Sequence, residues 1–219
     1  MFRMSNHMGF GVIPKLMALS VFDSATSTAS TIVAPASIVP GDLIVLFDSA
    51  VSTGTPSTVT PTGFTNINTV TVGTATIRKS ICSYKIAVGD EGGATITGMN
   101  GNQQNGKMIY VFRGNVAITS VVVGDVGSQG TDGDPVAQTI TSASGIPPLV
   151  VFGAYAGGTA VSPRTFTVGG SSAKDGEITS STSAYLAYKI YDSAPSDVVV
   201  DMEDETVNNT LQSFYLQAA

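Results

Sequence analysis

The sequence predicts an all-β fold, a two-sheet sandwich of the jelly-roll-like or immunoglobulin-like kind with an internal pseudo-repeat. Three observations predict it: short apolar runs bounded by turn residues, no segment with convincing helical periodicity, and a set of motifs that occurs twice. Short strands punctuated by Gly, Pro and Asn are typical of sandwiches and barrels.

The clearest predicted strand follows the turn Pro40-Gly41-Asp42. Residues 43–47 are five consecutive apolar residues. Such a run is too short for a typical helix and indicates a strand buried on both faces. A second run of this kind, residues 149–152, follows Pro147-Pro148.

The two apolar runs belong to a longer series of matches at nearly constant spacing. The matched pairs are Leu43 with Leu149, Phe64 with Phe166, Tyr84 with Tyr188, and Tyr110 with Phe214, at offsets of 102 to 106 residues. Self-similarity at a fixed period predicts a duplicated β unit, and chance matching of Thr/Ser-rich strands is the alternative. We expect one sandwich domain, residues 21–219, made of half-units 21–114 and 115–219.

The remaining strands are predicted from alternation of polar and apolar residues. They are expected near residues 31–33, 64–72, 76–88, 94–97, 107–113, 121–123, 136–140 and 211–216. In the segment 107–113, Met108, Tyr110 and Phe112 share one face. Turn-forming residues predict exposed loops over 49–63, 99–106 and 127–134.

Residues 1–20 differ from the rest and are expected to form an extended docking arm. A cleaved signal peptide is not favoured, because there is one Arg and Pro14-Lys15 interrupts the apolar stretch. An exposed apolar arm needs a surface to cover it, so we expect it to pack on a neighbouring subunit. Its candidate interface residues are Met1, Phe2, Met4, Met8, Phe10, Ile13, Leu16 and Met17.

The composition is unusually poor in charge. Charged residues make up 12% of the 219 residues, about half the usual ~25%. Because interfaces are depleted in Lys and Glu, this favours a protein that assembles, and a Thr/Ser-coated extracellular β domain is the alternative. The net charge of −6 argues against nucleic-acid binding, which needs basic patches. No apolar run is long enough to predict a membrane-spanning helix.

The residues that could carry chemistry are few. His7 and Cys82 are the only histidine and cysteine, which excludes a zinc site and argues against nucleophilic catalysis. Cys82 lies within a predicted strand and is expected to be a small buried side chain. The sequence thus predicts no enzyme, no catalytic residue and no cofactor.

Two acidic segments contain the carboxylates that a calcium site would need. Asp125, Asp132 and Asp134 are expected in one Gly-rich loop and are candidates for a weak calcium loop, with turn-forming Asp as the competing interpretation. The acidic run 201–205 is expected to be a solvated loop or strand edge.

The repeated motifs resemble those of a known module. The ordered series P-G-D-L-[IV]-V, T-P-x-G-[FW]-T, Y-K-[IV]-A and F-R-G resembles a β-sandwich module of tailed-bacteriophage virion proteins, of the head-decoration or tail-fibre type. In this chain the series is carried by residues 40–45, 60–65, 84–87 and 111–114. The sequence departs from the module at Phe64, where Trp is usual.

The resemblance implies a structural component of the virion. The expected role is a capsid decoration, cement or minor capsid protein that stabilises the shell through subunit contacts. Its expected partners are the major capsid protein or neighbouring subunits, in a homo-oligomer such as a trimer. The alternative is a receptor- or glycan-binding module of a tail fibre or head spike, acting through the loops at 49–63 and 99–106.

Overall fold

The structure, a computed structural model, describes most of the chain after the arm. The described residues are 18–98, 106–131, 137–141, 149–157, 165–168, 174–180, 184–191, 197–203 and 209–218. Within these ranges every regular element is a strand, and no helix occurs. The expected all-β sandwich with an internal repeat is confirmed.

The first half of the chain forms one five-stranded antiparallel sheet in the order β1-β7-β3-β5-β4. Its strands are β1 (Leu19–Ser27), β3 (Leu43–Ser52), β4 (Thr65–Val72), β5 (Ile77–Ile86) and β7 (Gly106–Gly114). The predicted strand after Pro40-Gly41-Asp42 is therefore the central strand of this sheet, between β7 and β5.

The second half forms another five-stranded antiparallel sheet in the order β12-β13-β10-β15-β8. Its strands are β8 (Val121–Thr131), β10 (Leu149–Ala156), β12 (Gly176–Ser180), β13 (Ala184–Tyr191) and β15 (Asn209–Ala218). Read from β8, this order matches the first sheet strand for strand, with β3 corresponding to β10. The repeat is thus present in the topology.

The strand pairing also fixes the register of the repeat. Val45 pairs with Tyr84 and Tyr110, whereas Phe152 pairs with Tyr188 and Phe214. Val45 therefore corresponds to Phe152. The sequence match of Leu43 with Leu149 would instead align Val45 with Val151, one residue earlier. A shift of one residue turns every side chain of a strand to the other face, so the pairing determines the correct alignment.

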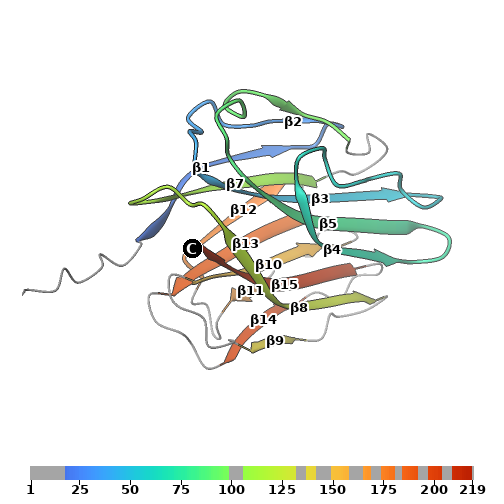
Figure 1. Cartoon of the computed structure of the whole chain (residues 1–219). Helices are drawn as coiled ribbons and strands as arrows, with labels where there is room; N and C mark the ends of the chain where they lie inside the picture. The colour runs from blue at the N-terminus through green and yellow to red at the C-terminus, as the bar shows by residue number, and fades with distance from the viewer. Residues whose placement is uncertain are drawn as a thin grey trace, which may run out of the picture.

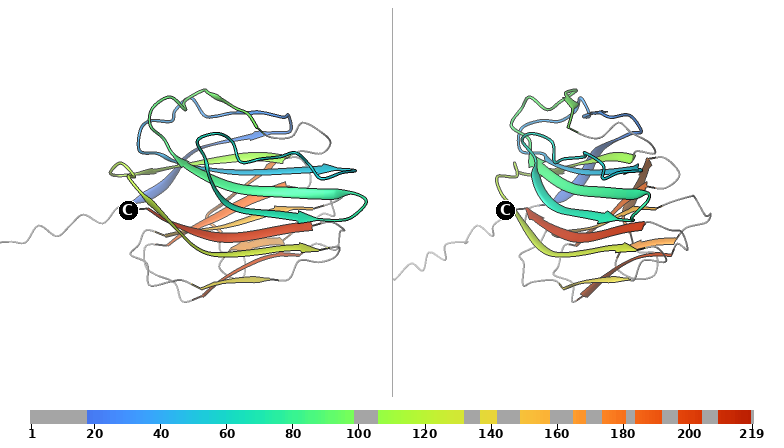
Figure 2. Two further views of the ribbon diagram at one scale, coloured as in Figure 1. Left: turned by 45° about the vertical axis from the view of Figure 1, so that its right-hand side comes forward. Right: turned by 90° about the vertical axis from the view of Figure 1, so that its right-hand side faces the viewer.

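The two large sheets are stacked, and each carries a small sheet on its outer side (Figures 1 and 2). β2 (Ile32–Val33) pairs with β6 (Thr95–Ile96) over the first sheet. Over the second sheet, β14 (Asp197–Glu203) pairs with both β11 (Thr165–Val168) and β9 (Gln138–Thr141). The four layers explain how the central strands become buried on both faces.

The core between the large sheets is rich in aromatic side chains. It includes Leu43, Val45, Phe47, Cys82, Met108, Tyr110, Phe112, Val150, Phe152, Leu186, Tyr188 and Phe214. The alternate residues of β3, Ile44 and Leu46, pack instead beneath β2 and β6. The predictions that β3 is buried on both sides and that Met108, Tyr110 and Phe112 share one face are confirmed.

The expected loop over residues 127–134 is wrong for residues 127–131. β8 continues through these residues and pairs with β15 along its length, with one bulge at Phe214/Tyr215. The glycines there allow close packing: a Cβ added to Gly130 would lie 2.8 Å from Cβ of Val72, in β4 of the opposite sheet. Glycine in this strand therefore marks the contact between two sheet edges, as is known for strand glycines approached by other groups.

The expected exposed loop over residues 49–63 is also wrong in part. β3 extends to Ser52, and Pro56, Thr58 and Pro61 are buried. This loop covers part of the outer face of the first sheet, and its end forms one wall of the pocket described next.

Candidate functional site

A pocket of about 270 Å³ lies on the outer face of the first sheet. One wall is the segment before β4, with Pro61, Thr62 and Phe64, and the other is the segment 94–97 that contains β6. Ile44 of β3 also lines the pocket, as do Lys85 at the end of β5 and the following turn. The pocket is therefore enclosed by segments that are distant in the sequence.

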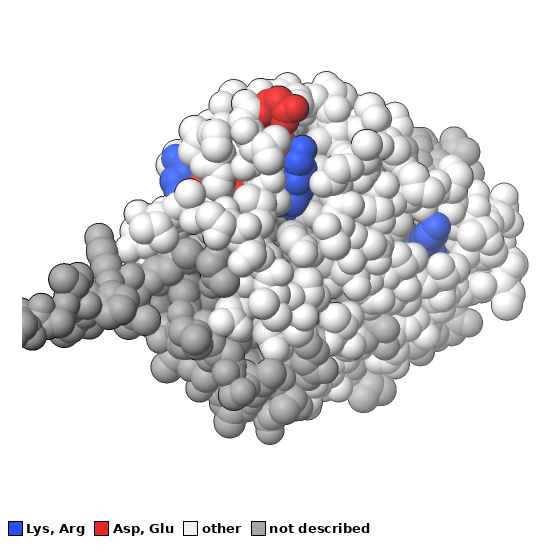
Figure 3. Space-filling view, viewed as in Figure 1, with Lys and Arg blue, Asp and Glu red and all other residues white. Residues whose placement is uncertain are grey.

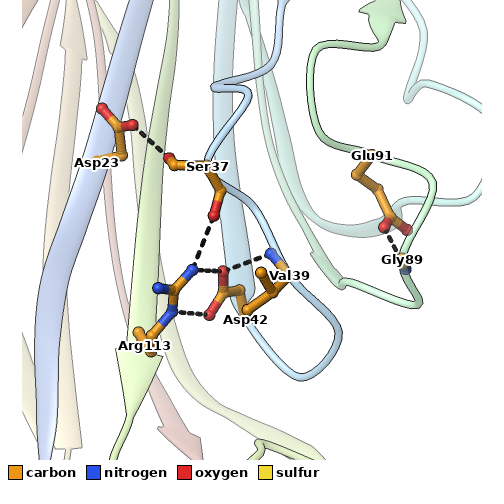
Figure 4. Close-up of polar contacts among 7 residues, drawn as sticks. All are labelled: Asp23, Ser37, Val39, Asp42, Gly89, Glu91 and Arg113. Atoms are coloured by element: carbon orange, nitrogen blue, oxygen red, sulfur yellow. Dashed lines mark hydrogen bonds and ion pairs between the residues drawn. The ribbon is translucent and has the colours of Figure 1, made fainter.

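The charged part of this pocket is built around Glu91. The Lys85 ammonium lies 2.7 Å from Glu91 Oε1. The Glu91 carboxylate also accepts backbone N–H groups of Val88, Gly89 and Asp90, at 3.0, 2.9 and 3.2 Å from Oε2; the contact with Gly89 is drawn in Figure 4. Asp90 itself remains 82% exposed, with Oδ1 4.0 Å from the Lys85 ammonium.

These contacts fix Glu91 in its ionised form. Burial alone would raise the pKa of Glu91, but the hydrogen bond from Lys85 and the backbone N–H groups outweigh it and lower the pKa to about 2. The turn 88–91 is thus organised by a permanent negative charge, and Lys85 is held at the pocket by its ion pair.

Glu91 should make the stability of the protein depend on acid. Its pKa is lower in the folded than in the unfolded chain, so ionised Glu91 stabilises the fold above about pH 4.5, and this contribution is lost as the pH falls towards 2. We expect Glu91→Gln to cost about 1.5–3 kcal/mol at neutral pH, as expected for hydrogen bonds to a charged group. Urea unfolding of both proteins across this range should show the difference shrinking in acid. A constant difference would contradict this assignment.

A second polar cluster joins two of the motifs that carry the family resemblance. Arg113 donates from Nε to Asp42 Oδ1 and from Nη2 to Asp42 Oδ2, both at 2.7 Å (Figure 4). Asp42 Oδ2 also accepts the backbone N–H of Val39, and Arg113 Nη2 donates to the carbonyl of Ser37. The hydrogen bonds to Asp42 raise the pKa of Arg113 further.

The neighbouring Gly41 explains why this motif needs glycine. Its φ is +86°, a conformation that residues with a side chain rarely adopt. A Cβ there would also lie 2.6 Å from Cβ of Ala117. The N–H of Gly41 donates to the carbonyl of Ala87, and the N–H of Ala87 donates to the carbonyl of Asp42. Motif residues 40–42, 87 and 113 therefore meet in one structural junction at the start of β3.

A buried ion pair lies on the same outer face of the first sheet. Asp48 and Lys107 are directly opposite each other on β3 and β7, and Lys107 Nζ is 3.2 Å from Asp48 Oδ1. Their side chains are 3% and 0% exposed. Burial raises the pKa of Asp48, and Lys107 and Thr58 partly offset this. Such a pair, closed off from water, is suited to holding two strands together rather than to chemistry.

The residues predicted as sites are placed as follows. The arm residues, Asp132, Asp134 and the side chain of Asp125 lie outside the described residues, although the Asp125 backbone is part of β8. Cys82 is fully buried, as predicted, and burial raises the pKa of its thiol. Among the residues that the structure describes, no three acidic, His or Cys side chains gather to hold a metal ion.

No helix in the described part of the chain is long and apolar enough to cross a membrane.

Sequence reasoning missed the pocket. It interpreted residues 84–87 only as part of a strand and a motif, and it assigned no role to the acidic residues that follow. The available signal was the pair of acidic residues, Asp90 and Glu91, in the turn that follows the strand containing Lys85. Nothing in the sequence indicated that residues 61–64 would form the facing wall.

Comparison of this chain with protein-family models, curated proteins and solved structures found no match.

Proposed function

We propose that the protein is a structural component of a bacteriophage virion, a capsid decoration or cement protein that stabilises the shell through subunit contacts. The low charge supports this role, and on the face shown in Figure 3 the described surface carries few charged side chains. The motif resemblance supports it as well, because its residues Asp42, Ala87 and Arg113 form a structural junction.

The observation that carries the proposal is an exposed apolar patch at the start of β3. Phe22, Val39 and Val116 are 46%, 44% and 53% exposed. The Arg113 guanidinium lies over the Phe22 ring, with Cζ 3.4 Å from the ring centroid. Val39 and Val116 line a hollow of about 180 Å³ that also contains Arg113. A clustered apolar surface of this kind indicates a contact with another protein.

The patch lies where the described chain begins. Ala18 exchanges two hydrogen bonds with Asn115, each 3.0 Å long: its N–H donates to Asn115 Oδ1 and its carbonyl accepts Asn115 N–H. Asn115 is the neighbour of Val116 and belongs to the same hollow. Residues 1–17 therefore join the described chain beside this patch, and we propose that the arm and the patch together supply the surface for shell contacts.

The test is the mass of the purified protein in solution, with and without residues 1–17. We expect the full chain to be an oligomer and the truncated chain to be a monomer by light scattering. The truncation keeps Ala18 and its two bonds to Asn115, so the truncated chain should still fold, with a thermal midpoint lowered only by the loss of subunit contacts. An unchanged oligomer after truncation, or a full chain that neither self-associates nor binds phage shells, would contradict the proposal.

A second candidate function is a glycan- or receptor-binding module. It is favoured by one observation, the pocket between residues 61–64 and β6. Residues 61–63 are the last residues of the loop 49–63, which is expected to bind sugar. Of the other expected loop, residues 99–106, residues 99–105 lie outside the described residues.

A further inference from the structure

The pocket occupies a position that the second half of the chain fills with paired strands. Residues 60–65 correspond to residues 162–167 in the sequence repeat, and β6 corresponds to β14 in chain order. In the second half the matching segment forms β11 and pairs with β14. In the first half no strand forms between β3 and β4, and the space between residues 61–64 and β6 is the pocket. The two halves therefore differ in structure at this place.

One end of this space is closed. The N–H of Val59 donates to the carbonyl of Gly98 at 3.3 Å, joining the two walls beyond Pro61 and Thr97. This bond leaves no room for a peptide strand to pass between the two walls in the way that β11 lies beside β14. A compact ligand fits better, and the volume of about 270 Å³ lies at the small end of the roughly 300–1,000 Å³ typical of ligand pockets.

The lining offers both an apolar surface and hydrogen-bonding groups. Phe64, Ile44 and Ile96 provide the apolar part. Lys85 spends one N–H on Glu91 and has two further donors. The Asp90 carboxylate, 82% exposed, can accept hydrogen bonds, and Thr62, Thr95 and Thr97 are exposed side chains with hydroxyl groups. This combination suits a ring with one apolar face and hydroxyl groups around its edge.

We propose that this pocket binds a single neutral pyranose ring, such as a terminal hexose of a surface glycan. The apolar face of the sugar lies on Phe64, and vicinal hydroxyl groups bridge Asp90 and Lys85. The charges in the pocket favour a neutral sugar. The net charge of Lys85, Asp90 and Glu91 is −1, which disfavours a carboxylated or phosphorylated ligand. The inference rests on the second proposed function and does not depend on the virion role.

The test uses the full chain and saturation-transfer NMR with methyl glycosides of glucose, galactose, mannose and N-acetylglucosamine. We expect saturation transfer to at least one of them, and Asp90→Asn to weaken that binding about tenfold, the loss expected for one hydrogen bond to a charged group. Asp90 is exposed, so this change should leave the fold intact. Thr97→Val should weaken binding several-fold, whereas Thr71→Val, on an exposed position of β4, should leave it unchanged.

Three outcomes would overturn the inference. The first is no transfer to any of the four glycosides. The second is binding that Asp90→Asn and Thr97→Val both leave unchanged, which would move the sugar site elsewhere and leave the glycan-binding function standing. The third comes from a fifth probe, N-acetylneuraminic acid: if it binds more strongly than every neutral sugar, the charge argument is contradicted. None of these results bears on assembly through the arm.

Discussion

Replacing Lys107 with Met is expected to lower the free energy of unfolding by about 3–5 kcal/mol, the usual cost of breaking a buried ion pair. The change removes the Lys107 ammonium, which lies 3.2 Å from Asp48 Oδ1, and leaves the Asp48 carboxylate buried opposite an apolar side chain. Burial already raises the pKa of Asp48, and losing Lys107 raises it further. The variant should therefore recover part of its stability as the pH falls and Asp48 takes up a proton, and urea unfolding at several pH values measures both effects.

The double variant Asp48→Asn/Lys107→Met is the matched control. It removes both charges, and replacing a whole buried pair is often close to neutral. We expect it to be clearly more stable than Lys107→Met alone. If the single change costs under about 1 kcal/mol, or if the double variant is the less stable of the two, the pair does not hold β3 to β7 as described.

Phe152→Ala is expected to cost about 3–5 kcal/mol, as large-to-small changes in cores do. Phe152 is fully buried between the two large sheets. Its ring stacks on Phe214 at 5.0 Å and meets the edge of Phe112 at 5.4 Å, so its loss removes contacts to both sheets. Chemical unfolding followed by circular dichroism gives the cost.

Phe22→Ala provides the comparison for this second change. Phe22 is 46% exposed at the apolar patch, so its removal should destabilise the isolated chain far less than removal of Phe152. The same variant should weaken self-association if the patch is a contact surface. Equal destabilisation by the two changes would show that the central core is not where the sandwich gains its stability.

Much of the fold followed from residues 43–47 and their partners. A run of apolar side chains can avoid water only if both faces of its strand are covered, so the sequence already required layers on either side of β3. The alternation of Met108, Tyr110 and Phe112 with Ile109 and Val111 made the same demand of β7. Both halves bury such strands in sheets of the same strand order, and the repeat was therefore visible as matching motifs in the sequence.

The sequence by itself therefore determined the fold class, the two-sided burial of β3 and the existence of two similar halves, because these depend on the local order of apolar side chains. Tertiary structure alone decided the pairing of Asp42 with Arg113, the strand at Gly127 to Gly130 and the one-residue register of the repeat. It also decided the pocket at Lys85. Each of these depends on groups far apart in the chain being brought within a few ångströms, and hydrogen-bond pairing across strands, rather than residue type, sets which groups meet.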